Sequence, residues 1–398
     1  MRAALPLLLP ALALALALAA CGPAPIASDG GGSDAGMTAA PLAPELGTGD
    51  HSATSVGFTV IASSTASLAG PRDIAFNPLR PDEAWVVNHD TESVTIIHDA
   101  STMGRTTEWR EDGYATHFMA DVSAIAFGAD ATSTAPIPTG VGGLPGTFAT
   151  TGESRNTYDG QAAPNDFMGA TLWSSDLSVF AMYNPMGLGS HLDMLHCSPL
   201  GMGIAHESAN VYWVIAGRSN GATSTNITKY DFNSDNGVGN DNHSDGEAWR
   251  YVEGMVGYAP GIPSHLVFDP ATSLLYIADT ANSRILALDT TSGTVGAALA
   301  PFEPMAGYNR VDGAVLTEVV TAASGILQSP SGLELHDGLL YITDNANSRF
   351  FAVDLQGNLA NYLETPLAPG SLSGFAFGPD GKIYFVDMLG DQVVRIDP

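Results

Sequence analysis

Two fourteen-residue segments of the chain are nearly identical. YIADTANSRILALD covers residues 276–289, and YITDNANSRFFAVD covers residues 341–354, 65 positions later. Each segment follows a similar lead, PSHLVFDPATSLL from Pro263 and PSGLELHDGLL from Pro330. Apolar residues alternate in both with a period of two, which is typical of β-strands and not of helices. The repeated unit is therefore predicted to be a small antiparallel sheet of consecutive strands.

Weaker copies of this unit occur in the rest of the chain, and six units result when one position of the first strand is aligned. The aligned residues are Asp73, Ala124, Gly203, His265, Gly332 and Gly374. Small sheets that cannot cover their own faces bury them by stacking, and a stack that curves round on itself is a propeller. The predicted fold class is therefore all-β, a six-bladed β-propeller over residues 56–398.

The sixth unit has one strand too few. Its third strand, QVVRID, ends almost at the C-terminus, whereas the segment VGFTVIAS at residues 56–63 precedes the first unit and has no other partner. We predict that this N-terminal strand completes the sixth sheet and closes the ring. The two ends of the domain would then be held together.

The two repeated segments resemble NHL repeats, and the whole domain resembles a six-bladed NHL β-propeller. The resemblance is closest in the fourth and fifth units. It implies that the loops between second and third strands, and those leading into each first strand, surround the central channel on one face, where such folds bind ligands. Asp279 with Arg284, and Asp344 with Arg349, are expected to brace the loop between the second and third strands.

The N-terminal segment is predicted to direct export. Residues 1–20 contain one Arg and an almost unbroken apolar run, which is typical of a signal peptide, and Pro6 and Pro10 argue against a membrane span. The segment LAAC resembles a bacterial lipobox, which implies that Cys21 is acylated. Residues 21–55 are rich in Gly, Pro, Ala and Ser and are predicted to be a disordered tether. We therefore expect a membrane-anchored lipoprotein in the periplasm or on the cell surface.

The charge of the chain limits its partners. The formal net charge is −28, with 42 acidic and 14 basic residues. Nucleic acid is therefore not expected as a partner, and cations would be attracted. Cys197 has no partner if Cys21 carries lipid, so the domain has to be stable through its core alone.

Histidine is the residue type that most suggests a site, because neutral imidazole binds metals and exchanges protons near neutral pH. His117 leads into the second unit and His196 into the third, while His265 occupies the aligned first-strand position. We predict that these three residues converge at the channel mouth, joined by Glu153 from a loop of the second unit. The expected cofactor is a transition metal such as zinc. The alternative is that these residues are structural.

A second candidate ion site is the acidic segment DFNSDNGVGNDNHSDGE at residues 231–247. Alternating Asp and Asn with Gly turns supply oxygen ligands at short spacing, as calcium requires. The candidate ligands are Asp231, Asn233, Asp235, Asp241 and Asp245. Neither half completes an EF-hand loop, so the alternative is a solvated acidic turn.

Known propeller enzymes provide a comparison for the activity. Peptidylglycine α-amidating lyase is similar in fold and holds zinc through histidines that follow the Pro of three first-strand leads. Here those positions are Arg72, Ser264 and Ser331, so its zinc triad is not present. Gluconolactonase-like and regucalcin-like propellers use a first-strand Glu that has no identifiable counterpart. No nucleophile elbow or phosphate-binding glycine loop occurs, and no catalytic residue is assigned.

Two functions remain open on the sequence alone. The first is a module that binds a small-molecule or protein ligand, with or without a metal at the channel mouth. The alternative is a metal-dependent lyase or hydrolase, distantly similar to the amidating lyase. The fold does not decide between them.

Overall fold

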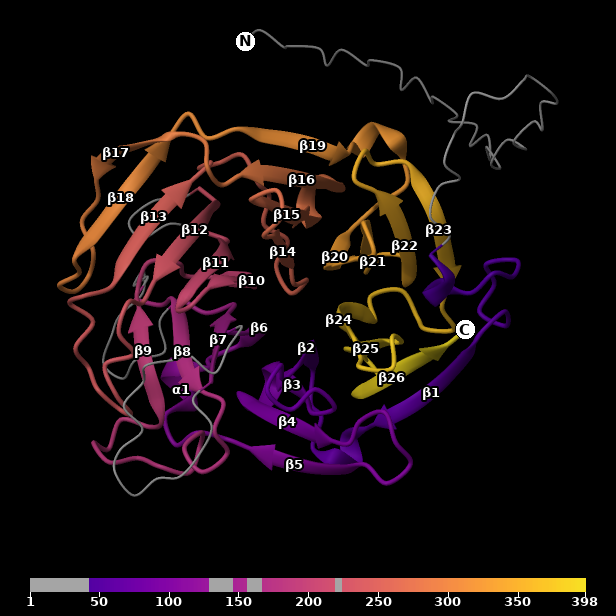
Figure 1. Ribbon diagram of the computed structural model, residues 1–398, viewed down its shortest axis with the longest axis horizontal. Helices are drawn as coiled ribbons and strands as arrows, with labels where there is room; N and C mark the ends of the chain where they lie inside the picture. The colour runs from indigo at the N-terminus through magenta and orange to yellow at the C-terminus, as the bar shows by residue number, and fades with distance from the viewer. Residues whose placement is uncertain (1–42, 129–145, 156–166, 219–223) are drawn as a thin grey trace, which may run out of the picture. The chain divides into compact units, whose positions relative to one another are not determined.

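The computed structural model describes residues 43–128, 146–155, 167–218 and 224–398. These residues form six sheets around a central axis, which confirms the predicted six-bladed β-propeller (Figure 1). The predicted signal peptide, Cys21 and most of the predicted tether lie outside the described residues. In the described ranges, no helix has the length and apolar character needed to cross a membrane.

Four blades are antiparallel sheets of four strands that run in chain order from the channel to the rim. Blade 1 contains β2 (Pro71–Phe76), β3 (Ala84–Asn88), β4 (Ser93–His98) and β5 (Thr106–Arg110). Blade 2 contains β6 (Val122–Phe127), β7 (Thr147–Gly152), β8 (Ala170–Ser174) and β9 (His191–Leu195). Blade 4 contains β14 (Leu266–Asp269), β15 (Leu274–Asp279), β16 (Arg284–Asp289) and β19 (Leu316–Val320). Blade 5 contains β20 (Pro330–His336), β21 (Leu339–Asp344), β22 (Arg349–Asp354) and β23 (Leu359–Glu364).

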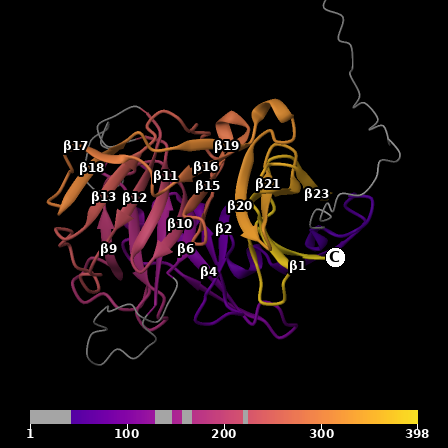
Figure 2. The ribbon, with the colours of Figure 1, turned by 45° about the horizontal axis from the view of Figure 1, so that its top comes forward.

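Blade 3 is enlarged by a hairpin that the sequence did not predict. Its own strands are β10 (Gly201–Ser208), β11 (Val211–Ala216), β12 (Asn226–Asp231) and β13 (Glu247–Tyr251). The hairpin of β17 (Thr294–Ala298) and β18 (Gly307–Asp312) lies in the chain between two strands of blade 4, yet β18 pairs in parallel with β13. Figures 1 and 2 both show the hairpin outside β13. Blade 3 is therefore a six-stranded sheet.

Blade 6 is closed by a strand from the beginning of the domain, as predicted. It contains β24 (Leu372–Phe377), β25 (Ile383–Asp387), β26 (Gln392–Asp397) and β1 (Gly57–Ala62). β1 runs antiparallel to β26, with Phe58 opposite Ile396 and Val60 opposite Val394. The first and last strands of the propeller therefore share one sheet.

The burial of each strand follows its position in the blade. Every residue of β3 and of β21 is buried, because these strands are covered on both faces by neighbouring blades. The outermost strands β5 and β17 are largely exposed. The blades pack through large rings: Trp85 of blade 1 contacts Phe127 and Phe148 of blade 2 edge-on, with centroids 5.4 and 4.9 Å away.

Short helical turns connect the strands. They are α1 (Ala115–Phe118) and the 3-10 turns Pro44–Leu46, Ser64–Ala66, His89–Thr91, Thr280–Asn282 and Ala322–Ser324.

The predicted tether of residues 21–55 extends too far. Ala43 and Leu46 are buried against blades 5 and 6. The ring of His51 stacks on the ring of Tyr362 with centroids 4.2 Å apart. Nδ1 of His51 is also hydrogen-bonded to the backbone carbonyl of Tyr362 at 3.0 Å. Apolar residues and a stacking partner are sufficient to order residues 43–55, although the composition of this segment is typical of a linker.

One of the two predicted Asp–Arg braces forms. Nε of Arg284 donates to Asp279 at 2.7 Å. Arg349 instead donates to Glu364 at 2.7 Å, while Asp344 accepts from backbone N–H groups in the loop. The prediction for the fifth unit was therefore wrong, because backbone donors satisfy its buried carboxylate.

Candidate metal site in the rim between blades 2 and 3

Three segments bring polar side chains together at the rim between blades 2 and 3. The first is the end of β9, the outermost strand of blade 2. The others are the loop between β12 and β13 and the loop between β17 and β18. The backbone N–H of Gly239 in the β12–β13 loop donates to the carbonyl of His191, and the N–H of Ala306 donates to the carbonyl of Gly246. Two long loops of blade 3 are thus fastened to each other and to the edge of blade 2.

His196, directly after β9, and Glu303, in the β17–β18 loop, form a buried pair. Nδ1 of His196 lies 2.6 Å from both carboxylate oxygens of Glu303, and its backbone N–H donates to the same group at 3.1 Å. Burial lowers the pKa of His196, and Glu303 offsets only part of this effect. Burial would raise the pKa of Glu303, but hydrogen bonds and charge from His196 outweigh it and lower that pKa.

Near neutral pH this pair is therefore a neutral imidazole that donates from Nδ1 to a carboxylate, the tautomer being assigned from the hydrogen bonds. Nε2 of His196 is then an acceptor. It is buried and has no hydrogen-bond partner.

His243 and Asp193 form a second imidazole–carboxylate pair. Nδ1 of His243, in the β12–β13 loop, lies 2.6 Å from Oδ1 of Asp193, which is fully buried on β9. Burial acts to lower the pKa of His243, but the hydrogen bond and charge of Asp193 outweigh burial and raise it. Asn236 donates to the other oxygen of Asp193 at 3.1 Å. These contacts fix the imidazole with Nε2 on the side away from Asp193.

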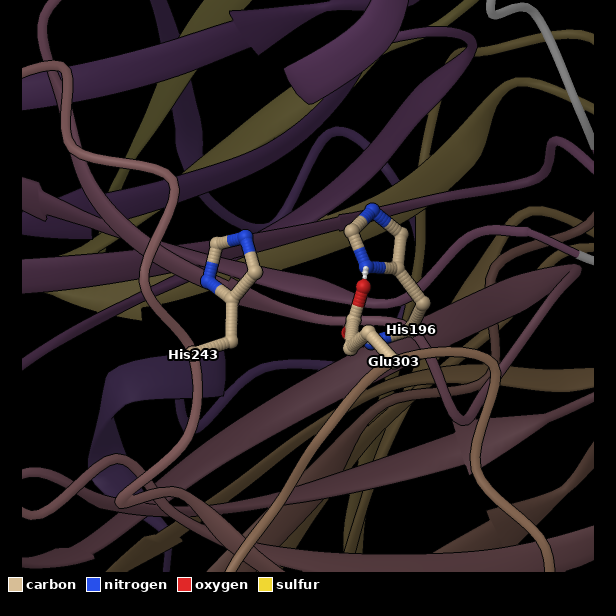
Figure 3. A group of neighbouring side chains, drawn as sticks. All are labelled: His196, His243 and Glu303. Carbon is tan, nitrogen blue, oxygen red and sulfur yellow. Dashed lines mark hydrogen bonds and ion pairs between the residues drawn. The ribbon is translucent and has the colours of Figure 1, made fainter.

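The two pairs meet in one cluster, the rim cluster of His196, His243 and Glu303. One ligand atom from each residue lies within 4.8 Å of those of the other two. Figure 3 shows the hydrogen bond between His196 and Glu303, with the ring of His243 to the left of this pair. Two imidazoles and a carboxylate are a typical zinc ligand set. Because Glu303 accepts from Nδ1 of His196, either Glu303 orients His196 to bind through Nε2, or the carboxylate turns from His196 to the metal. Each arrangement leaves at least one tetrahedral position open. His196 is buried, whereas His243 and Glu303 are half-buried, so the cluster can be reached from solvent.

Aromatic rings form the wall of the rim cluster. Phe167 stacks on His196 with centroids 3.7 Å apart, and His117 of α1 lies 5.6 Å from the same ring. Phe118 stacks on His191 at 3.7 Å. Burial lowers the pKa of His117 to about 4 and that of His191 to about 3, so both are neutral at pH 7. The surroundings therefore exclude water without adding positive charge.

Only two of the four residues predicted for the channel mouth lie together. His117 and His196 are neighbours, but at the rim. His265 precedes β14, the innermost strand of blade 4, and its Nδ1 lies 3.5 Å from Oδ2 of Asp73 on β2. The innermost strand of a blade borders the channel, whereas the outermost strand lies at the rim. His265, beside an innermost strand, therefore does not join the rim cluster.

Glu153, after β7, also takes a different role. It accepts hydrogen bonds from the hydroxyl of Tyr258 at 2.5 Å and from the backbone N–H of Gly261 at 2.9 Å. Gly261 in turn accepts from the guanidinium of Arg72. Glu153 therefore joins loops of different blades and is not placed with the histidines.

The acidic loop that was predicted to bind calcium packs on β9. Asp231 accepts from the backbone N–H of Asn233 at 2.8 Å, and Asp245 accepts from the amide of Asn236 at 2.9 Å. Burial raises the pKa of Asp235 to about 6. Within the described residues, Asp231, Asp235, Asp241 and Asp245 form no group of three whose ligand atoms all lie within 4.8 Å. The contacts that the structure gives these oxygens hold the loop, which presents His243.

Glu303, His243 and Asp193 were not identified from the sequence as site residues. A signal for Glu303 exists, because the aligned positions His265 and Gly332 are 67 residues apart, whereas Gly332 and Gly374 are 42 apart. The difference indicates an insertion in the fourth unit. It does not indicate that the insertion pairs with the third blade.

The comparisons with known proteins agree with the fold. No family model matches the chain, and no curated protein matches it in sequence. Among solved structures, an auxiliary nutrient binding protein from Bacteroides thetaiotaomicron superposes with a TM-score of 0.52 at 12% identity, over 83% of this chain and 69% of that chain. A Xanthomonas campestris gluconolactonase gives a TM-score of 0.49 at 10% identity, over 87% of this chain and 90% of that chain. The virginiamycin B lyase of Staphylococcus aureus gives 0.45 at 12% identity, over 86% and 99%.

At 12% identity, the likeness to the nutrient binding protein shows the fold alone. The class of protein is a six-bladed β-propeller, and its particular feature is the candidate rim site, where two long loops of blade 3 meet the outer strand of blade 2.

Proposed function

We propose that this protein is an extracytoplasmic β-propeller that binds a divalent transition metal, zinc being the best fit, and presents it at the rim to a ligand or protein partner. The rim cluster carries this proposal, because ligand atoms of His196, His243 and Glu303 lie within 4.8 Å of one another. Imidazole nitrogen favours zinc-type ions over calcium or magnesium. The net charge of −28 raises the local concentration of cations.

The hydrogen bonds around the cluster support the same conclusion. Metal-binding histidines usually donate their other ring N–H to a carboxylate or carbonyl, which fixes ring and tautomer. Asp193 does this for His243. A buried acceptor without a partner, such as Nε2 of His196, costs about 1–3 kcal/mol, which a bound ion would recover.

To test this, metal is first removed from the protein with a chelator, and the chelator is then removed. Zinc is titrated into this protein in competition with a chromophoric indicator. We expect one tightly bound zinc per chain. His196→Ala and His243→Ala should each weaken binding by about 100-fold or more, as loss of a direct ligand does. Glu303→Gln should weaken it by about 10–100-fold if Glu303 only orients His196, and by more if it is a ligand.

His336→Ala is the matched control, because His336 belongs to a second, more exposed group with Glu45 and Asp337. It should leave zinc affinity unchanged. The proposal is overturned if the wild type binds no zinc, or if only the His336 variant loses it.

The family and the membrane anchor are part of the proposal. We infer that the domain is an NHL-type propeller, supported by the repeated segments YIADTANSRILALD and YITDNANSRFFAVD. We also propose that a lipid on Cys21 holds it to a bacterial membrane. In cell fractionation, Cys21→Ser should move the protein from the membrane fraction to the soluble fraction, and an unchanged distribution would refute the anchor.

A metal-dependent lyase or hydrolase is the second candidate. It is favoured by the open coordination position, where a bound water would become acidic, and by the ring of His117 at 5.6 Å from His196. A panel of lactone and ester substrates, offered to zinc-loaded protein and to the His117→Gln variant, separates the two. Turnover that needs both zinc and His117 would establish the enzyme. If none of the substrates is converted, the binding module is favoured.

A further inference from the structure

The central channel contains a cavity of about 430 Å³ between the innermost strands of the six blades. At one equivalent position of the innermost strands, most of the side chains that line this cavity are small and apolar. They are Ala75, Ala126, Ala205, Val267 and Ala376. The equivalent position of blade 5 is Glu334, a carboxyl group in an otherwise apolar ring.

Two more polar side chains line the same cavity. Asp73 and His265 come from blades 1 and 4, which are opposite in a ring of six, and their side chains approach to 3.5 Å across the channel. Both are buried, whereas Phe76, Phe268 and other residues near the ends of the inner strands are half-buried. The cavity is therefore more open at the aromatic end, and Asp73 and His265 lie toward the enclosed end.

The hydrogen bonds in the channel are incomplete. Asp73 accepts from the backbone N–H groups of Ile74 at 2.8 Å and Ile125 at 2.9 Å. His265 is 5% exposed, and its Nε2 is buried without a partner. Among the described residues, Glu334 has no hydrogen-bond partner, and burial raises its pKa to about 8. Buried polar groups in proteins are nearly always hydrogen-bonded. Two unsatisfied groups beside one cavity therefore indicate that a ligand completes their hydrogen bonds.

We propose that the channel binds a small primary ammonium compound, with the ammonium group between Asp73, Glu334 and His265 and its alkyl part along the apolar wall. An ammonium group has three N–H donors, and these three side chains offer three acceptors. The remaining titratable groups that line the cavity are His206 and His336. The cavity volume is in the range of sites for small organic ligands, which is larger than a single ion needs.

Other ligand classes fit less well. A bare metal ion is disfavoured because Asp73, Glu334 and His265 form no group whose ligand atoms all lie within 4.8 Å in the described part of the chain. An anion would meet two carboxyl groups and an imidazole that burial keeps neutral, so it would find no positive charge. A neutral alcohol would satisfy fewer acceptors than an ammonium group does.

The test is calorimetric titration of the purified, metal-free protein with n-butylammonium, and with 1-butanol and tetramethylammonium as probes that lack the three N–H donors. We expect saturable binding of butylammonium alone. Burial raises the pKa of both Glu334 and Asp73. Because an ammonium ion favours ionised carboxylates, binding at pH 7 should release protons, measured by repeating the titration in buffers of different ionisation enthalpy.

Glu334→Gln keeps the size of the side chain and should weaken butylammonium binding by about tenfold or more and reduce proton release. Glu111→Gln removes the same charge at an exposed position and should change the affinity by less than about twofold. His196→Ala should have no effect, which separates the channel from the rim cluster. The proposal is overturned if butylammonium does not bind saturably, if 1-butanol binds equally well, or if the Glu111 and Glu334 variants behave alike.

Discussion

Nδ1 of His243 lies 2.6 Å from Oδ1 of Asp193, although 50 residues separate the two in the chain. One residue belongs to a loop of blade 3 and the other to the outer strand of blade 2. The rim cluster therefore exists only when these blades are packed together. A metal bound there would stabilise this blade interface, because it binds the folded state and not the separated blades.

The first prediction concerns Asp193, which orients His243 without belonging to the three-residue cluster. Asp193→Asn should weaken zinc binding by about 10–100-fold, as does the loss of a carboxylate that orients a metal-binding histidine. Asp269→Asn is the matched control, since Asp269 is also a buried carboxylate, accepting from Ala271 at 2.9 Å, but lies in blade 4. Indicator titrations of both variants measure the effect, and equal losses in the two would show that only general destabilisation is involved.

The second prediction is a pH effect on stability through Glu334. Burial raises the pKa of this carboxyl from 4.5 to about 8 in the folded state. Between those values the folded protein keeps a proton that the unfolded chain has lost, so stability falls as pH rises. Glu334→Gln removes this loss. Relative to wild type, the variant should gain about 2 kcal/mol between pH ~5 and ~8, a value below the full shift because the carboxyl borders the channel.

Urea denaturation of both proteins at the two pH values, in metal-free buffer, measures this difference. Asp73 and the channel histidines are present in both proteins, so their titration largely cancels. Parallel pH profiles would contradict the assignment of the raised pKa to Glu334.

The third prediction compares the two arginines of the repeated segments. Arg284 bonds Asp279, which is fully buried, whereas Arg349 pairs with Glu364, both of them well exposed. Arg284→Met should destabilise the protein by about 1–3 kcal/mol, because it leaves a buried carboxylate with fewer donors. Arg349→Met should cost less than about 0.5 kcal/mol. Equal shifts of the thermal midpoint would mean that the two repeats are energetically equivalent.

The fourth prediction concerns the closing pair of strands. Ile396 on β26 is fully buried, and Ile396→Ala should cost about 2–4 kcal/mol through lost apolar burial and a residual cavity. Val60 on the partner strand is 47% exposed, and Val60→Ala should change stability by less than about 0.5 kcal/mol. Chemical denaturation measures both, and a small effect at Ile396 would show that closure does not limit stability.

The repeat was sufficient to predict the architecture, because each unit carries its own alternating strands and turn residues. Closure by residues 56–63 was also predictable, since the sixth unit lacked a strand. The order of residues 43–55 was not predictable. It depends on the stacking of His51 on Tyr362 and on the burial of Leu46, contacts that no local composition reports.

The site was predictable only in part, for a geometric reason. The sequence indicates which residues lead into a first strand, and this identified His117 and His196. It does not indicate which edge an inserted hairpin will pair with, and the parallel pairing of β18 with β13 is what carries Glu303 to His196. His265 was predicted in the first strand of the fourth unit, but it directly precedes that strand and faces Asp73 across the channel.

The pairing of β1 with β26 also sets a schedule for biosynthesis. β1 is made before every other strand of the ring, yet its partner is completed only at residue 397. Until β26 is available, β1 has no partner strand. Its unpaired backbone N–H and C=O groups can pair with the wrong strand or promote aggregation. A factor that shields this segment until the last strand emerges would improve the folding yield without touching the finished molecule.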